Sequence, residues 1–261
     1  MRLDTGTRVL ITGASRGIGA ALARQLAARG CVLGLVARGE DGLREMAGSL
    51  PGEGHRALPA DVADRDSTRA AVADFGDVDV VVANAGVSHS RPWLELGPED
   101  DLQMTQVNWL GTLNTVRATL PGMVARRSGH VVVVSSGAAL RGFPGASAYA
   151  GTKAAQRGFA EALWHELDGT GVGVTVVYPG EIATDLHAHE WDALPEWRRG
   201  GHDADVDECA AAIVAGVERD RRGVYFPREV RLLRIAHGIS PRLADLALRR
   251  LRGRGAAPRS R

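Results

Sequence analysis

The chain has 261 residues, a length that a single large domain can fold around one core. Its formal net charge of +1 gives no reason to expect nucleic-acid binding, and two cysteines, Cys31 and Cys209, cannot build a disulfide framework. No apolar stretch is long enough to span a membrane, and the N-terminus lacks the apolar core of a signal peptide. We therefore expect a reduced, cytoplasmic setting in which both thiols are buried.

Short apolar runs alternate with helical patterns along most of the chain. The runs typical of strands are residues 8–12, 32–36, 55–60, 79–83, 131–134, 172–178 and 223–226. The patterns typical of helices cover residues 20–30, 41–49, 64–75, 98–126, a segment that begins at 147, and 206–219. Several of the strands are apolar without alternation, which indicates a parallel sheet covered on both faces. The sequence thus predicts a doubly wound, Rossmann-like α/β fold with about seven parallel strands in three layers.

The first expected strand runs into a glycine-rich turn, GASRGIG, which covers residues 13–19. Such a turn presents backbone N–H groups and the positive end of a helix dipole, and its glycines let a pyrophosphate approach the main chain. The spacing of Gly13, Gly17 and Gly19 differs from the GxGxxG of other dinucleotide folds. The turn therefore predicts a phosphate site, although glycine-rich turns also occur as plain connections.

The end of the second expected strand indicates which dinucleotide binds. An acidic residue at this place would hold the ribose 2′-hydroxyl of NAD, but Ala37 and Arg38 stand there instead. Arg38 and Arg16 could bracket a 2′-phosphate, because guanidinium groups match phosphate oxygens in geometry and charge. We expect NADP(H) on this argument; the alternative is two solvated surface arginines.

The run from Val131 to Gln156 holds the candidate chemistry. Its buried strand ends at Ser135 and Ser136, and Tyr149 and Lys153 follow four residues apart on a helix, so that they share one face. The pKa of a free tyrosine is about 10, and proton transfer at neutral pH needs a downward shift of this pKa worth about 4 kcal/mol. An ammonium about 4 Å away supplies an energy of that order. The alternative is that Tyr149 and Lys153 are an ordinary amphipathic pair on a helix, and that the two serines are only the polar end of a strand.

Five expected strand ends carry polar or glycine-rich groups. They are the glycine turn, Arg38, Asp61, Asn84 and Ser136. Ligands of doubly wound sheets bind outside the carboxyl ends of the strands, so these groups are predicted to meet at one edge. This convergence favours a binding site over five unrelated features.

Asn108 lies near the middle of the long helix expected over residues 98–126. Asparagine is mildly unfavourable inside a helix, so it marks either a local helix distortion or a polar relay. The sequence alone favours a third interpretation, a solvated asparagine.

The motifs together resemble those of the short-chain dehydrogenase/reductase family from residue 7 to residue 227. They are TGASRGIG at 12–19, NAG at 84–86, Asn108, Ser136, YAGTK at 149–153 and PGEIAT at 179–184. The resemblance implies that Tyr149 is the catalytic acid/base and that Lys153 lowers its pKa and holds the nicotinamide ribose. It also implies that Ser136, rather than Ser135, orients the substrate carbonyl, and that Asn108 anchors a proton-relay water.

The resemblance also implies a cofactor site for NADP(H) and a hydride transfer between the nicotinamide and a carbonyl or secondary alcohol. Its residues are Thr12, Gly13, Ser15, Arg16, Gly17, Ile18, Gly19, Arg38, Asp61, Val62, Asn84, Ala85, Gly86, Tyr149, Lys153, Pro179, Gly180, Ile182 and Thr184. Reduction of a bulky apolar ketone or aldehyde is the expected activity. The alternatives are an NADP-dependent alcohol dehydrogenase of steroid-like or lipid-like substrates, and a non-catalytic NADP-binding sensor.

Residues 181–205 form the segment that in this family folds over the substrate. Four residues are candidate substrate contacts: Trp93, Glu181, Trp191 and Trp197. The tryptophans suggest a bulky apolar substrate, unless they only fix the segment to the body, and Glu181 could equally face solvent. His187 and His189 suggest a metal only weakly, because a loop fixes no ligand geometry and this chemistry needs no metal. We expect no metal.

The chain continues beyond the catalytic domain, which is predicted to cover residues 1–227. Residues 228–252 alternate apolar residues with arginines and are expected to form a helical extension, and residues 253–261 a disordered basic tail. We favour packing of the extension on the body or on a second subunit over contact with an anionic membrane surface. The family resemblance implies a homodimer or homotetramer through the helix that begins near Ser147, with Phe159, Leu163 and Trp164 as candidate contacts.

Overall fold

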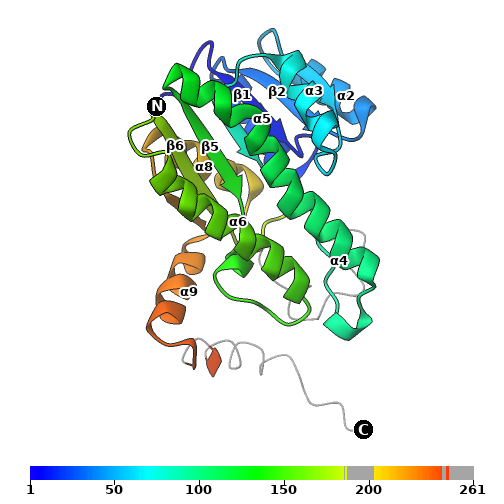
Figure 1. The fold of residues 1–261 in the computed structure, drawn as a ribbon, viewed down its shortest axis with the longest axis vertical. Coiled ribbons are helices and arrows are strands. Elements are labelled where there is room, and N and C mark those ends of the chain that lie inside the picture. Colours follow the sequence, from blue (N-terminus) through cyan, green and yellow to red (C-terminus); the bar gives the residue numbers. More distant parts are fainter. Residues whose placement is uncertain (185, 187–202, 243–244, 247–261) are drawn as a thin grey trace.

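The computed structural model describes residues 1–184, 186, 203–242 and 245–246. Its centre is a sheet of seven parallel strands in the order β3-β2-β1-β4-β5-β6-β7 (Figure 1). The strands are β1 (Arg8–Thr12), β2 (Val32–Ala37), β3 (Arg56–Pro59), β4 (Val80–Ala83), β5 (Gly129–Val134), β6 (Val172–Pro179) and β7 (Gly223–Phe226). The strand order reverses direction between β1 and β4, which is where ligands of doubly wound sheets bind.

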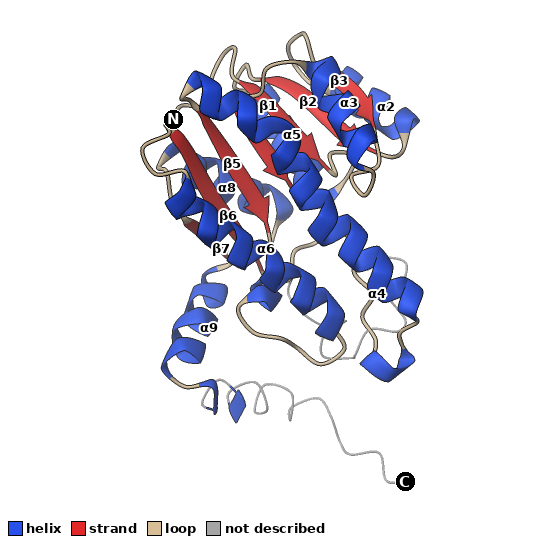
Figure 2. Cartoon of the chain, viewed as in Figure 1, coloured by secondary structure: helices blue, strands red, loops and turns tan. Residues whose placement is uncertain are grey.

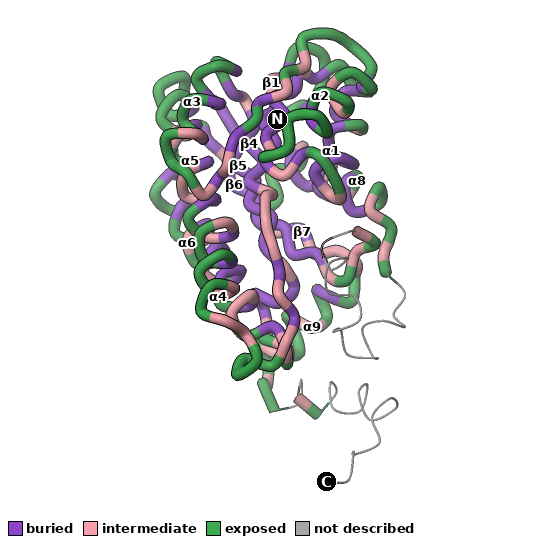
Figure 3. The backbone as a smooth tube through the Cα atoms, turned by 90° about the vertical axis from the view of Figure 1, so that its right-hand side faces the viewer, coloured by how far each residue is buried: buried purple, intermediate pink, exposed green. Residues whose placement is uncertain are grey.

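Helices cover both faces of the sheet (Figure 2). They are α1 (Gly17–Ala27), α2 (Glu40–Ser49), α3 (Arg65–Phe75), α5 (Gly111–Arg126), α6 (Ser147–Glu166) and α8 (Val206–Glu218). Two further helices, α4 (Pro98–Met104) and α9 (Arg228–Ile239), lie beyond the carboxyl ends of the strands. One buried cluster joins the sheet to α1, α2 and α8, and the other joins it to α3, α5 and α6 (Figure 3). The predicted doubly wound, three-layer fold is therefore confirmed.

The β5 strand shows why the centre of the sheet is apolar on both faces. It pairs with β4 on one side and β6 on the other, and residues 131–134 are all buried. The sequence predicted its start at Val131, but the strand begins at Gly129. The difference arises because the polar His130 is itself buried, and its Nε2 lies 2.8 Å from Thr175 Oγ1 on β6.

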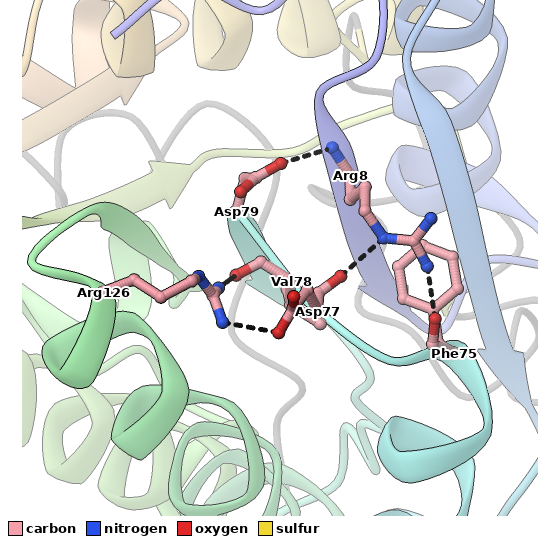
Figure 4. Close-up of polar contacts among 6 residues, drawn as sticks. All are labelled: Arg8, Phe75, Asp77, Val78, Asp79 and Arg126. Atoms are coloured by element: carbon pink, nitrogen blue, oxygen red, sulfur yellow. Dashed lines mark hydrogen bonds and ion pairs between the residues drawn. The ribbon is translucent and has the colours of Figure 1, made fainter.

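Two arginines hold the loop that precedes β4 at the amino edge of the sheet (Figure 4). Arg8 on β1 donates from Nε to Asp77 O over 2.8 Å and from Nη2 to Phe75 O. Arg126 at the end of α5 donates to Asp77 Oδ1 over 2.7 Å and to Val78 O over 2.9 Å. These bonds fix where β4 starts, and so also the position of the loop at its carboxyl end.

The sequence predicted one helix over residues 98–126, but three elements occupy this range. Between α4 and α5 lies a π-helical stretch, Thr105–Leu110, with Asn108 inside it. A π-helix shifts the backbone hydrogen bonds by one residue and often occurs at functional sites. The local distortion considered for Asn108 is thus present.

The C-terminal extension begins with α9, whose two sides have different surroundings. Val230 is buried against the body, whereas Leu232 and Ile239 are exposed. After the extended Ser240, residues 241–242 and 245–246 are again helical; the rest of the predicted extension and the basic tail lie outside the described residues. Within the described part of the chain, no helix is long and apolar enough to cross a membrane.

Candidate active site

A cavity of about 660 Å³ lies at the carboxyl edge of the sheet. The predicted site residues that line it are Gly13, Ser15, Arg16, Gly17, Ile18, Arg38, Asp61, Val62, Asn84, Ala85, Gly86, Ser136, Tyr149, Lys153, Pro179, Gly180, Glu181, Ile182 and Thr184. Thr12, Gly19 and Asn108 are not among its lining residues. The segments that follow β1, β2, β3, β4 and β5 all contribute, together with the one after β6, so the predicted convergence of strand ends occurs in the structure.

Thr12 and Asn84 hold the glycine turn from behind. Thr12 Oγ1 accepts hydrogen bonds from the backbone N–H groups of Asn84 (3.0 Å) and Ala85 (3.1 Å). The Asn84 side chain donates from Nδ2 to Thr12 O over 2.9 Å. A Cβ on Gly19 would lie 2.3 Å from Gly13 O, so a side chain there would push the turn away from α1. The glycines are thus required for close packing of the turn.

The start of α1 fits a phosphate group. Arg16 is the N-cap residue, no side chain caps the helix, and its first turn contains no acidic residue. The first N–H groups of a helix have no partner within the helix, and the helix dipole favours an anion beside them. Arg16 and Gly17 both line the cavity, so these groups lie at its wall. The residues present therefore fit a dinucleotide pyrophosphate.

The two serines after β5 have different hydrogen bonds. Ser135 is buried, and its Oγ donates to Lys153 O on α6 over 2.8 Å. Ser136 is partly exposed, and its Oγ accepts from Ala138 N over 3.1 Å, which leaves its proton for a bond elsewhere. Ser135 therefore ties α6 to the sheet, and Ser136 is the better placed of the two to donate to a ligand.

Lys153 is the single lysine of the chain. Its side chain is buried, and Nζ donates to Val134 O, the last carbonyl of β5, over 3.0 Å. Nζ also lies 5.6 Å from the centroid of the Tyr149 ring, one turn earlier on α6. Burial lowers the pKa of Lys153 from its ordinary value of 10.5 to about 7. The amine can therefore gain or lose its proton near neutral pH.

Asn108 is completely buried, so the interpretation as a solvated asparagine is wrong. Its Oδ1 accepts from Val87 N over 2.8 Å, and its Nδ2 donates to Val87 O (2.9 Å) and to Thr152 Oγ1 (3.1 Å). The π-helical stretch turns this side chain inward, where it holds the chain after Gly86. A Cβ on Gly86 would lie 3.3 Å from Asn108 Oδ1 and 3.5 Å from Lys153 Nζ, so Asn108 shapes the wall beside the lysine.

Sequence reasoning missed Gln156, which is also completely buried. Its Nε2 donates to Asn108 O over 2.8 Å and to Thr112 Oγ1 over 2.7 Å. The signal was present in the sequence, because Gln156 is a polar residue on the same helical stripe as Lys153 and Ala160. It joins α6 to the π-helical stretch.

The candidate substrate contacts lie only in part where the sequence predicted them. Trp93 lies on a short 3₁₀ turn (Trp93–Glu95) that buries no residue; it is 60% exposed and does not line the cavity. Glu181 does line it. Trp191, Trp197, His187 and His189 lie outside the described residues. The apolar lining residues that the sequence did not identify include Phe143, Leu186, Val230 and Leu233.

Both cysteines are buried, as expected, and burial raises the pKa of Cys31 to about 11. Among the residues that the structure describes, no group of three or more His, Cys, Asp or Glu side chains could hold a metal ion.

Comparison with known proteins agrees with this geometry. The family model described as short chain dehydrogenase matches residues 7–194. An uncharacterized oxidoreductase of Myxococcus xanthus is 37% identical over 93% of this chain and 96% of its own length. The glycine betaine reductase ATRR of Emericella nidulans is 38% identical over 72% of this chain, which spans only 15% of that protein.

Two solved structures show the same fold with cofactors. A short chain dehydrogenase from Burkholderia cenocepacia in complex with NADP has a TM-score of 0.81, at 25% identity over 99% of this chain and 100% of its own. A short chain dehydrogenase/reductase from Burkholderia phymatum in complex with NAD has a TM-score of 0.84, at 24% identity over 93% of this chain and 96% of its own.

The fold, the cavity and these similarities define an oxidoreductase of the nicotinamide-dinucleotide class. The chain belongs to the short-chain dehydrogenase/reductase family.

Proposed function

We propose that this chain is an NADP(H)-dependent reductase of bulky apolar ketones or aldehydes. The observation that carries the proposal is that Ser136, Tyr149 and Lys153 line the same cavity as Arg16 and Arg38. The dihydronicotinamide of the bound cofactor supplies the hydride. The chain's own residues bind the carbonyl, supply the proton and hold the cofactor.

Ser136 and Tyr149 act on the carbonyl oxygen in this proposal. Ser136 Oγ already accepts from Ala138 N, so its O–H donates to that oxygen. The Tyr149 hydroxyl supplies the proton as the oxygen gains negative charge. Lys153 lies one helical turn from Tyr149 and exchanges its proton near neutral pH, which suits it to a proton path behind the phenol.

Asn108 takes a positioning role in this proposal, beside the anchoring of a relay water that the family resemblance implies. Its backbone O already accepts from Gln156 Nε2 and Thr112 Oγ1, both over 2.8 Å. Its side chain is bonded to Val87 and Thr152. These contacts use the backbone O and both Nδ2 protons of Asn108, and they support a role in fixing the wall beside Lys153.

The preference for NADP(H) rests on charge. Arg16 and Arg38 both line the cavity, and Ala37 and Arg38, rather than a carboxylate, stand at the end of β2. A 2′-phosphate carries charge that two guanidinium groups can bind, whereas a carboxylate at the end of β2 would repel it.

The experiment is an oxidation assay with NADPH and NADH over ketones, aldehydes, steroids, β-keto thioesters and quinones. We expect turnover of an apolar carbonyl and a higher kcat/KM with NADPH. Arg38→Ala should reduce this preference, whereas Arg44→Ala, an exposed arginine paired with Glu40 on α2, should not. A strong preference of the wild type for NADH would contradict the proposal.

Two alternatives remain distinct from a reductase. The same site could work as an NADP-dependent alcohol dehydrogenase, because the direction of the reaction depends on the cofactor ratio in the cell. An assay with NADP and secondary alcohols measures this oxidative activity. A non-catalytic NADP-binding sensor would bind NADPH but turn over nothing. The presence of Ser136, Tyr149 and Lys153 in one cavity favours an enzyme, since binding alone does not need a proton donor.

We further propose a cytoplasmic homodimer or homotetramer. Of the expected contacts on α6, Leu163 is buried within the chain, whereas Phe159 and Trp164 are partly exposed. On α9, the exposed Leu232, Ile235 and Ile239 could instead pack on a second subunit; contact with an anionic membrane is the alternative. Light scattering measures the assembly, and co-sedimentation with liposomes tests the membrane contact.

A further inference from the structure

The C-terminal helix α9 forms part of the wall of the active-site cavity. Val230 and Leu233, one turn apart on α9, both line the cavity. Val230 is buried, and its methyl groups lie 3.1 Å from where a Cβ on Gly180 would stand and 3.5 Å from the same position on Gly137. These glycines directly follow Pro179 and Ser136. The first turn of α9 therefore packs on the two loops that carry the proposed nicotinamide and carbonyl contacts.

Contacts along α9 fix its position on the body. Gly180 N donates to Phe226 O over 2.7 Å just before the helix starts. Farther along, the Arg234 guanidinium lies 5.2 Å from the centroid of the Tyr225 ring, and His237 Nδ1 lies 3.3 Å from Arg141 Nη1. The helix is thus held along its length, so it presents Leu233 to the cavity as a fixed side chain.

The sheet order places this wall far from the adenosine end of the cavity. Arg38 follows β2, whereas α9 follows β7, and β1, β4, β5 and β6 lie between these two strands. Other apolar side chains of the cavity, Phe143 and Leu186, come from segments outside the strands. A ligand whose carbonyl lies at Ser136 and Tyr149 can therefore extend toward α9 without competing with the cofactor.

We propose that Leu233, supported by Val230, selects substrates whose non-reacting part is an extended apolar chain or ring. This inference rests on the proposed carbonyl reduction and names its substrate class. A leucine wall offers no partner for a charged or strongly polar group, and burial of such a group without a partner is unfavourable. An apolar group instead gains from leaving water there. The C-terminal helix thereby belongs to the substrate site.

The test is NADPH-dependent reduction of the linear methyl ketones from 2-butanone to 2-decanone. The wild-type kcat/KM should rise with chain length. Leu233→Ala should lower kcat/KM for 2-decanone by about tenfold and leave 2-butanone nearly unchanged, since only the longer chain reaches the side chain. Leu233→Trp should block 2-decanone and retain 2-butanone.

The matched controls are Leu232→Ala and Leu232→Trp. Leu232 is the preceding residue on the same helix, and at 65% exposure it does not line the cavity. Both control variants should show the wild-type dependence of kcat/KM on the chain length of the ketone. NADPH affinity, measured by fluorescence, should be unchanged in all four variants, which shows that the cofactor site is intact.

The outcomes separate this inference from the proposed function. Turnover with the same chain-length profile in the Leu233 and Leu232 variants would overturn the inference and leave the reductase proposal intact. If the wild type reduces no ketone, the apolar wall is tested instead by calorimetry, which measures the binding of 2-decanone to the NADPH complex of each variant. Weaker binding to Leu233→Ala alone supports the apolar wall without the reductase, and equal or no binding to all variants overturns it.

Discussion

Lys153 Nζ donates to the carbonyl oxygen of Val134 over 3.0 Å, so the side chain of the chain's single lysine lies against the last residue of β5. Its burial and the resulting low pKa, about 7, make the charge of this site sensitive to what binds beside it. Anions near a buried amine favour its protonated form. Lys153 lines the same cavity as the start of α1, where a pyrophosphate fits, so the phosphates of a bound dinucleotide should raise the pKa of Lys153.

The first prediction is that NADPH binding takes up a proton above pH 7. The amine is mostly neutral there in the ligand-free chain and protonated in the complex, so the affinity should fall with rising pH, by up to about tenfold per unit. Calorimetry in buffers with different ionisation enthalpies measures the uptake. Lys153→Met should abolish it. Because the chain has one lysine, a lysine-labelled sample should give one side-chain NMR signal whose titration reports the pKa directly.

The second prediction concerns Tyr149. Tyr149→Phe removes the proposed proton donor and keeps the ring. Turnover should therefore fall by about 10²-fold to 10⁴-fold, the usual contribution of acid–base catalysis. NADPH binding should stay close to that of the wild type. Tyr225→Phe is the control, since Tyr225 stacks on Tyr178 and does not line the cavity. Near-normal turnover of Tyr149→Phe would exclude the mechanism.

The third prediction is that Gln156 stabilises the junction between α6 and the π-helical stretch. Gln156→Leu removes the two hydrogen bonds that Nε2 donates to Asn108 O and Thr112 Oγ1; Asn108 O keeps its bond from Thr112 Oγ1, and each lost hydrogen bond costs about 1 kcal/mol. The free energy of unfolding in urea should fall by that order. Gln106→Leu changes an exposed glutamine of the same stretch and should have little effect. Equal stability of the two variants would show that the Gln156 bonds contribute nothing.

The sequence predicted the sheet, its parallel strands and the groups at its carboxyl edge because these depend on local signals. Apolar runs without alternation mark buried strands, and glycines and polar residues mark their ends. Asn108 and Gln156 depend instead on a contact between two helices far apart in the chain. The buried stripe of its helix could have indicated the burial of Gln156, but a π-helical shift of one residue leaves no pattern in the sequence. Neither the burial of Asn108 nor its bond with Gln156 could therefore be predicted.

The cavity wall formed by α9 also depends on contacts between segments far apart in the chain, which the sequence does not reveal. The alternation of apolar residues and arginines after Pro227 predicted an amphipathic helix, but not which apolar residues face the body. That choice follows from the packing of Val230 on Gly137 and Gly180, which are separated from it by long stretches of chain. Likewise, the exposure of Trp93 follows from a turn whose orientation the sequence does not specify.

The fourth prediction is that His130 weakens the fold in mild acid. The ring is 3% exposed, and burial lowers its pKa from 6.5 to about 4, although Asp220 acts in the opposite direction. Between these values the unfolded chain binds a proton that the folded chain does not. The unfolding free energy attributable to His130 should therefore be constant above pH 6.5 and fall by about 3 kcal/mol as the pH drops to 4.

Urea unfolding from pH 4.5 to pH 7.5 measures this dependence. His130→Gln keeps a polar group that can reach Thr175 Oγ1 but does not titrate, so the curve of the variant should be flatter than that of the wild type. His165→Gln changes an exposed histidine on α6 and should leave the slope as in the wild type. Identical slopes for wild type and His130→Gln would mean that the acid sensitivity arises from other groups, because the variant lacks the titrating ring.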